Sequence, residues 1–264
     1  GPYGHLRKSF HESTMASKAF QRFKDRMKSC AEDMELADIL VDRFRVTADS
    51  DQTLCEALGG DPKRHSLIHG RKNTAASRSI VAGHFRKTVQ VAFVKDLHED
   101  FSEYLATSLG RAALTGVDPN RYTGEVKIDI KAAELLAAGS WEAVVSLISN
   151  RIFRALENEK STSKLIRKIS DRLGLQLDEA ILNEAMPYLD ARHMLVHADG
   201  GTDEAYREAY PGVELDADNR IVINYSFVSS ALTKVKALVT HVDKKFVENN
   251  LVPAQHLQGP AAKK

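Results

Sequence analysis

The chain is poor in cysteine and has almost no net charge. Both features limit the classes of protein to which it can belong. Its 264 residues include 2 cysteines, Cys30 and Cys55, too few for a disulfide scaffold and typical of a reducing cytosol. The 37 basic and 36 acidic side chains create no overall positive field that would announce a nucleic-acid binder. No apolar run approaches the length of a membrane span, and the N-terminus lacks a signal-peptide core. We therefore expect a cytoplasmic protein without a membrane segment.

Composition and residues that mark boundaries divide the chain into segments. The opening Gly1-Pro2 is typical of a protease-cleavage remnant, and Met15 fits a natural start. The expected segments are a remnant over 1–14, an N-terminal helical extension over 15–75, a helical domain over 76–250 and a flexible tail over 251–264.

Apolar residues recur at helical spacing along most of the chain. The spacing predicts helices over 16–46, 77–109, 130–138, 140–157, 161–173, 178–197 and 226–248. Pro187 predicts a restart of its helix near Met186, and Trp141 is expected to pack into the core. Residues 213–223 alternate as a small hairpin would. The predicted fold class is all-α, a helical bundle with a small β-hairpin before the last helix.

The end of the helix over 178–197 carries the most informative side chains. Arg192 is followed directly by His193, and His197 comes just before Gly200-Gly201, a pair suited to ending a helix. The carbonyl groups at a helix C-terminus favour a protonated imidazole. Arginine can bind a phosphate through two hydrogen bonds, and histidine transfers protons near neutral pH. This combination suits chemistry on a phosphodiester.

The segment resembles the R-x(4–6)-H signature of the HEPN superfamily, and its context resembles the RiboL-PSP-type branch. The similar features are Leu189, Arg192, the polar residue His193, the apolar Leu195-Val196, His197, the glycines and the hairpin that precedes a last amphipathic helix. The resemblance covers residues 76–248 and leaves the first sixty or so unexplained.

The resemblance implies a metal-independent endoribonuclease that leaves a 2′,3′-cyclic phosphate and acts as a toxin or antiviral effector. It assigns acid–base chemistry to His197, contact with the scissile phosphate to Arg192, and orientation or substrate binding to His193. No cofactor or metal is expected. RNA is the expected substrate, and the expected partners are a second copy of the chain and a regulatory protein. In an ideal helix Arg192 and His197 lie about 140° apart, so a shared cleft needs a homodimer.

Other interpretations of the same residues stay open. The chain could be a noncatalytic HEPN scaffold, an RNA-binding module or an antitoxin-like regulatory subunit, with Arg192 and His197 only satisfying a helix end. Arg64 and His69 repeat the motif spacing, which we interpret as surface charge. The pairs His65/His69 and His193/His197 could chelate a metal ion if Asp199 or Asp203 supplied a further ligand.

A locally basic stretch over 61–87, where Asp61 is the single acid, is the best candidate for contact with an RNA backbone. A second basic stretch covers 151–172, and a solvated helix face is an equally good interpretation of both. The residues of the first stretch predicted to bind RNA are Lys63, Arg64, Arg71, Lys72 and Arg78.

Overall fold

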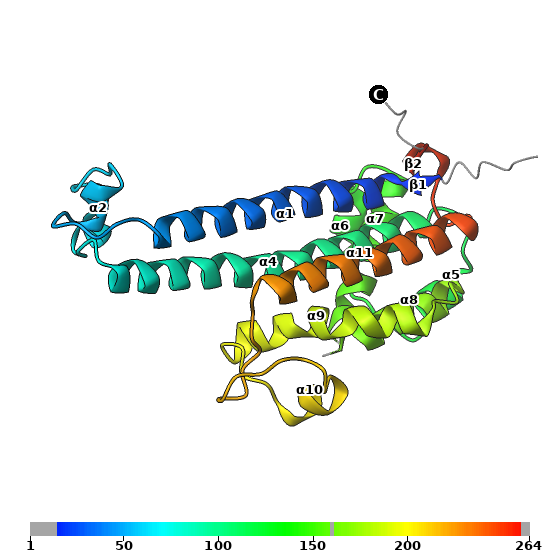
Figure 1. The fold of residues 1–264 in the computed structure, drawn as a ribbon. Helices are drawn as coiled ribbons and strands as arrows, with labels where there is room; N and C mark the ends of the chain where they lie inside the picture. Colours follow the sequence, from blue (N-terminus) through cyan, green and yellow to red (C-terminus); the bar gives the residue numbers. More distant parts are fainter. Residues whose placement is uncertain (1–14, 159–160, 260–264) are drawn as a thin grey trace, which may run out of the picture.

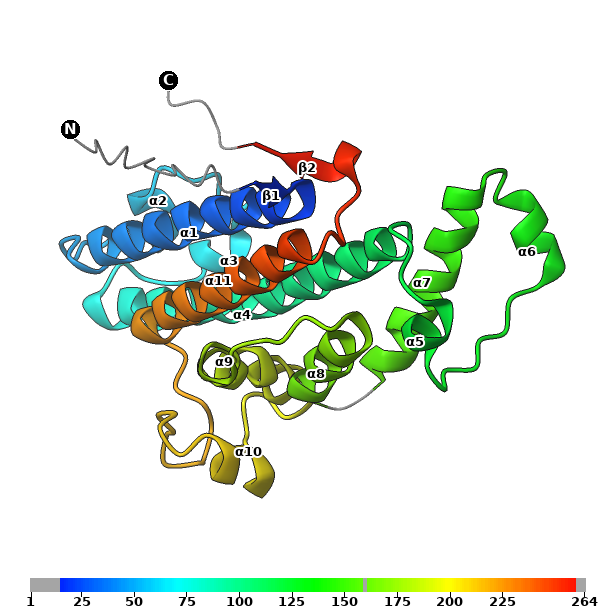
Figure 2. The same cartoon turned by 90° about the vertical axis from the view of Figure 1, so that its right-hand side faces the viewer.

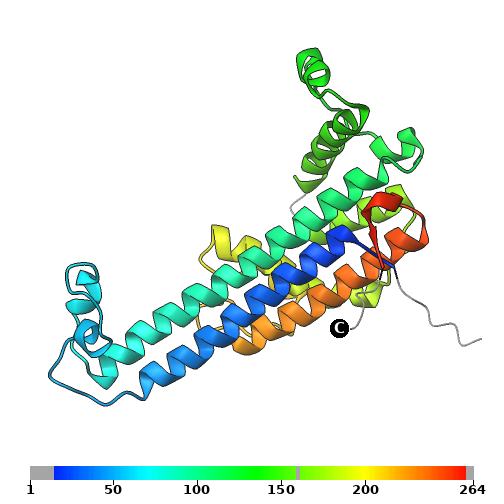
Figure 3. The ribbon, with the colours of Figure 1, turned by 90° about the horizontal axis from the view of Figure 1, so that it is seen from above.

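A computed structural model describes residues 15–158 and 161–259 and shows an elongated helical bundle (Figure 1). Two long antiparallel helices, α1 (Lys18–Arg45) and α4 (Ala75–Ala112), form its axis. Helix α11 (Tyr225–Glu248) lies beside both (Figure 3), and α9 (Glu179–His197) packs against α4 and α11 (Figure 2). The predicted all-α class is confirmed.

Shorter elements complete the bundle and its projections. They are α2 (Leu54–Ala57), α3 (Ser66–His69), α5 (Pro119–Thr123), α6 (Ala132–Ala137), α7 (Trp141–Glu157), α8 (Thr162–Leu173), α10 (Glu204–Ala209) and the 3-10 helix η1 (Ala254–His256). Helices α2 and α3 form a cap at the far end of the α1–α4 pair, whereas α8 lies beside α9 (Figures 1 and 2). None of the described helices is both long enough and apolar enough to cross a membrane.

The main helices begin at polar residues whose side chains accept a hydrogen bond from the first helical turn. These N-cap residues are Ser17, Thr74, Ser140, Ser161, Asp178 and Asn224. Their apolar faces meet in one core, in which Phe93 and Val235 are 4% and 0% exposed. The four- and three-residue spacing of the apolar side chains therefore predicts the buried face of α11 and that of α4 from Phe93 onward. Phe85, earlier in the same stripe of α4, is exposed.

The chain doubles back before α11, as the sequence predicts. Leu215 and Ile221 form an antiparallel bridge, and the backbone N–H of Asp216 donates to the carbonyl of Arg220. A separate two-stranded ladder, which the sequence did not indicate, pairs β1 (Ala16–Ser17) with β2 (Leu257–Gln258). Segments near the two ends of the chain are thereby held together.

Two segments that we expected to be an extension and a flexible tail pack against the bundle. Residues 15–75, expected as an extension, supply α1, which packs along α4 and contributes Phe23 and Met27 to the common core. In the expected tail, Leu251 is buried and β2 pairs with β1. Residues 1–14 and 260–264 lie outside the described part.

Two local predictions are wrong. Trp141, expected in the core, is 74% exposed at the start of α7. Pro187 does not divide its helix, since α9 runs without a break through that position. The helix tolerates the missing N–H because Leu182, Met186 and Leu189 on either side are buried against the core, and burial stabilises a helix more than propensity does.

Candidate active site

The last turns of α9 carry the three predicted catalytic residues. Backbone N–H groups of Ala198 and Gly200 both donate to the carbonyl of Met194, at 3.0 and 2.9 Å. Asp199 and Gly200 have φ values of 49° and 83°, so the chain turns away in the left-handed region. The helix end expected from the glycine pair is therefore present. The left-handed region begins at Asp199, one residue before Gly200.

Arg192 points from α9 toward α4 and lines a cavity of about 450 Å³. Its Nε atom is buried without a hydrogen-bond partner, and no carboxylate of the described residues forms an ion pair with its guanidinium. The cavity-lining residues are His98, Ser102, Glu157, Asn158, Thr162, Leu165, Leu189, Asp190, Arg192 and His193. An arginine without a carboxylate partner beside an open cavity retains its capacity to bind an anion.

His98 on α4 faces the same cavity, and the sequence analysis missed it. Burial, and then the charge of Arg192, lower the pKa of His98 to about 4. Its imidazole is therefore neutral at neutral pH and can accept a proton or donate one hydrogen bond. The available signal was its place directly after Leu97 and one turn after Val94, at the edge of the buried stripe of α4.

His193 and His197 form a pair on the outer side of α9. Their ring centroids are 4.6 Å apart and the rings are tilted by 49°. His193 also lines the cavity, whereas His197 is exposed and does not. The structure thus brings Arg192 together with His193 and His98, and it leaves His197 facing outward, as the divergence of helical positions implies.

Asp190, one turn before Met194, has other partners. It accepts hydrogen bonds from the Tyr210 hydroxyl and, at 3.4 Å, from the Thr162 backbone N–H. Burial, with the Asp190 hydrogen bond as the next cause, raises the pKa of Tyr210 well above its usual range. Asp190 therefore fastens the segment after α10 to α9 and leaves Arg192 without its carboxylate.

The basic residues predicted to bind RNA separate into two groups. Four of them are exposed on the cap formed by α2 and α3, namely Lys63, Arg64, Arg71 and Lys72. Arg78 is not among them: it is 3% exposed and bonded to Asp49 at 2.7 Å and Asn73 at 2.6 Å. Arg78 is therefore not part of this exposed basic surface. Its ion pair with Asp49 and its hydrogen bond to Asn73 fix the cap to the start of α4.

The exposed basic residues lie far from the cavity. Ala75, where α4 leaves the cap, precedes His98 by about 35 Å at the usual helical rise of about 1.5 Å per residue. The cap and the cavity could contact one ligand only if that ligand were an extended chain.

The segment that contains Arg64 and His69, which repeats the spacing of Arg192 and His197, has a structural role. His65 Nδ1 accepts a hydrogen bond from the Asp61 backbone N–H at 3.0 Å, and His69 Nδ1 lies 3.1 Å from the Thr53 hydroxyl. Both rings support the cap. Among the described residues, no group of three or more histidine, cysteine or acidic side chains is arranged to hold a metal ion.

The cavity combines an arginine that has no ion pair with the described residues, a neutral imidazole and a second imidazole, and it also contains the carboxylates of Glu157 and Asp190. Such a set can hold a phosphate group and move a proton beside it. Comparison with the models of known protein families, with curated proteins and with solved structures finds no match.

Proposed function

We propose that the chain is a metal-independent endoribonuclease of the HEPN type. One observation carries the proposal: the guanidinium of Arg192 has no ion-pair partner among the described residues and lines a cavity with His98 and His193. Arg192 is half-buried, and its buried Nε donor without a hydrogen-bond partner is costly unless a ligand compensates it. A phosphodiester supplies the matching charge and geometry.

The reaction needs groups that this site provides. The 2′-hydroxyl of RNA gives its proton to a neutral imidazole and attacks the adjacent phosphorus. Arg192 stabilises the charge that develops on the non-bridging oxygens. The bond from phosphorus to the 5′-oxygen breaks, and an imidazolium donates a proton to that leaving oxygen. The products are a 2′,3′-cyclic phosphate and a 5′-hydroxyl.

His193 and His197 are the proposed proton-transfer pair, with His197 as the main acid or base. Because His197 is exposed and does not line the cavity of its own chain, we propose a homodimer in which it completes the site of the second protomer. We infer a cytoplasmic toxin or antiviral effector, restrained by a regulatory partner, since an unrestrained ribonuclease would damage its own cell.

The test is cleavage of total RNA by the purified protein in EDTA. His197→Ala and Arg192→Ala should each lower the rate by about 100-fold or more, because acid–base groups and fixed charges contribute on that order. His193→Asn should have a milder effect, since it keeps a polar side chain. His69→Ala is the matched control and should cleave like the parent chain.

An inactive parent chain that still binds RNA would favour the noncatalytic scaffold. Cleavage that EDTA abolishes and zinc or manganese restores would contradict the proposed chemistry. The shared site has its own test, because mixing Arg192→Ala with His197→Ala should restore activity through mixed dimers. Light scattering that shows a strict monomer with full activity would exclude the dimer.

A further inference from the structure

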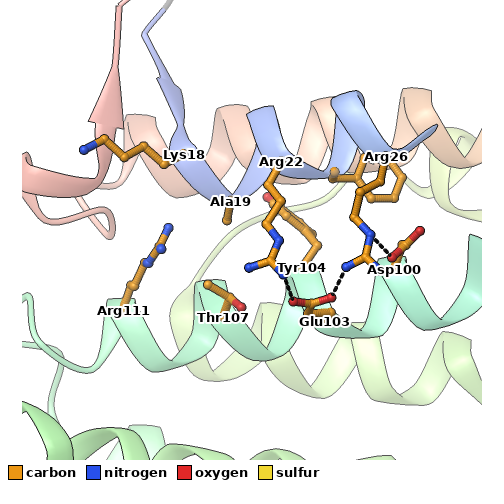
Figure 4. Close-up of a pocket in the computed structure, with 10 residues that line it drawn as sticks. Lys18, Ala19, Arg22, Arg26, Asp100, Glu103, Tyr104, Thr107 and Arg111 are labelled. Carbon is orange, nitrogen blue, oxygen red and sulfur yellow. Dashed lines mark hydrogen bonds and ion pairs between the residues drawn. The ribbon is translucent and has the colours of Figure 1, made fainter. Parts of the chain in front are cut away.

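A second cavity lies between the first turns of α1 and the last turns of α4 (Figure 4). Its volume is about 50 Å³. The charged residues that line it are Lys18, Arg22, Arg26, Arg111, Asp100 and Glu103. Four cations and two carboxylates leave a surplus of positive charge. The cavity shares no lining residue with that of Arg192, because it faces α1 whereas the Arg192 cavity faces α8 and α9.

Both carboxylates of this cavity are already occupied. Arg26 contacts Asp100 at 2.9 Å and Glu103 at 2.8 Å, and Arg22 contacts Glu103 at 3.1 Å. Figure 4 shows these ion pairs on one side of the cavity and Arg111 on the other, extending from α4 toward Lys18. The two acids therefore compensate Arg22 and Arg26, and no carboxylate of residues 15–158 and 161–259 forms an ion pair with Arg111.

Arg111 and Lys18 form no ion pair within the described residues, and Arg111 is the more buried of the two. Its Nη1 atom is buried and has no hydrogen-bond partner in the described part of the chain. Burial lowers the pKa of Arg111, and the charge of Arg22 lowers it further. A guanidinium with a buried donor left unpaired carries a desolvation cost that an anion would remove.

The same positive charge affects the pKa of His256, in η1. Burial is the largest cause that lowers the pKa of His256. The charges of Arg111 and Lys18 lower it further, whereas Glu142 raises it. Cationic side chains of α1 and α4 therefore act together on one small region near the β1–β2 pair. This field would attract an anion and repel further cations.

We propose that this cavity binds a phosphoryl group, as free phosphate or as the phosphate of a small nucleotide. A cavity needs roughly 10–15 Å³ on this measure to hold one water, so the available space admits one small oxyanion. Arg111 would bind two phosphate oxygens through its planar donors, while Lys18 neutralises the second negative charge. The site is independent of RNA cleavage at Arg192.

Titration calorimetry at constant ionic strength tests the site in the Arg192→Ala background, which removes the other proposed phosphate contact and serves as the parent chain here. The ligands are inorganic phosphate, 5′-AMP and, as the uncharged comparison, adenosine. Arg111→Gln should weaken phosphate binding by about tenfold or more, as the loss of charge-assisted hydrogen bonds implies. Lys18→Gln, at an exposed position that keeps the fold, should weaken binding less. Arg45→Gln, at the far end of α1, is the matched control and should bind like the parent chain.

Binding of phosphate or AMP that Arg111→Gln weakens and Arg45→Gln does not would establish the site. Tighter binding of AMP than of phosphate would identify a nucleotide as the source, and the reverse would identify free phosphate. Absence of phosphate and AMP binding, equal binding of adenosine and AMP, or binding that survives in Arg111→Gln would overturn the proposal. Circular dichroism checks that each variant folds. Phosphate binding in this background, together with no RNA cleavage by the chain that retains Arg192, would contradict only the proposed function.

Discussion

Three arginines of this chain differ in whether a carboxylate meets the guanidinium. Arg78 forms an ion pair with Asp49 inside the cap, whereas Arg111 and Arg192 each line a cavity and form no ion pair with the described residues. A buried nitrogen without a hydrogen-bond partner does not separate them, because the Nε atom of Arg78 has none either. Residue type alone would assign all three to phosphate binding. The placement of neighbouring carboxylates decides which arginine is structural and which remains free to bind an anion.

His98 gives a residue-scale prediction about pH. Its pKa is about 4 in the folded chain, below the ordinary value of 6.5. The unfolded chain therefore binds a proton at higher pH than the folded chain, and stability falls as pH drops from 6.5 toward 4. The loss should be on the order of 2–3 kcal/mol, measured by urea unfolding at both ends of this range.

The matched control for His98 is another histidine of α4. His98→Gln should remove this component of the pH dependence, whereas His84→Gln, at an exposed position, should retain it. If His98→Gln and the parent chain lose the same stability on acidification, the imidazole of His98 is not held neutral by its surroundings.

At the scale of elements, one buried carboxylate joins three segments. Asp243 of α11 accepts hydrogen bonds from the backbone N–H and hydroxyl of Ser17 and from the Tyr104 hydroxyl. Asp243 is 2% exposed. Burial and Asp243 raise the pKa of Tyr104 well above its usual range, so the phenol stays a donor. The start of α1 is thereby fixed to α4 and α11.

Removal of this carboxylate should be strongly destabilising. Asp243→Ala leaves the two donors of Ser17 and the phenol of Tyr104 buried without an acceptor, which should cost about 3 kcal/mol or more in the free energy of unfolding. Asp129→Ala, at an exposed position of the segment before α6, should change it by less than about 0.5 kcal/mol. Equal denaturation midpoints for the two variants would show that the three-element junction contributes little.

At the scale of the whole molecule, the exposed cations and the Arg192 cavity lie at different places along α4. The cap with Lys63, Arg64, Arg71 and Lys72 lies at one end, and the cavity lies about 35 Å along the helix. If an RNA strand occupies the cavity, as proposed, its flanking nucleotides could reach the cap. The cap would then add affinity without taking part in the chemistry.

Replacement of these four cap residues by glutamine should reduce the salt dependence of RNA binding. Each lost contact with a single strand should lower the slope of log K against log salt by about 0.7. The measurement is fluorescence anisotropy with labelled RNA in the Arg192→Ala background, which prevents cleavage. The double variant Lys127→Gln and Lys131→Gln is the control for charge loss elsewhere. A slope that the four replacements leave unchanged would place the RNA away from the cap.

The sequence by itself determined the helices and their ends, because these depend on local physics. Apolar spacing predicts the buried face of α11 and that of α4 from Phe93 onward, and the polar caps and the turn at Gly200 fix where helices begin and end. Arg192, His193 and His197 could be selected for the same reason, since neighbours in one helix end are neighbours in the chain.

Only the tertiary structure decided which side chains meet across helices. His98 and Arg192 are separated by about a third of the chain in sequence, and they line one cavity because α9 packs against α4. The burial of Arg78, the exposure of Trp141 and the position of Arg111 beside α1 follow from the same packing. Contacts between distant segments depend on how complete helices fit together, and periodicity within one helix carries no information about its neighbour's side chains.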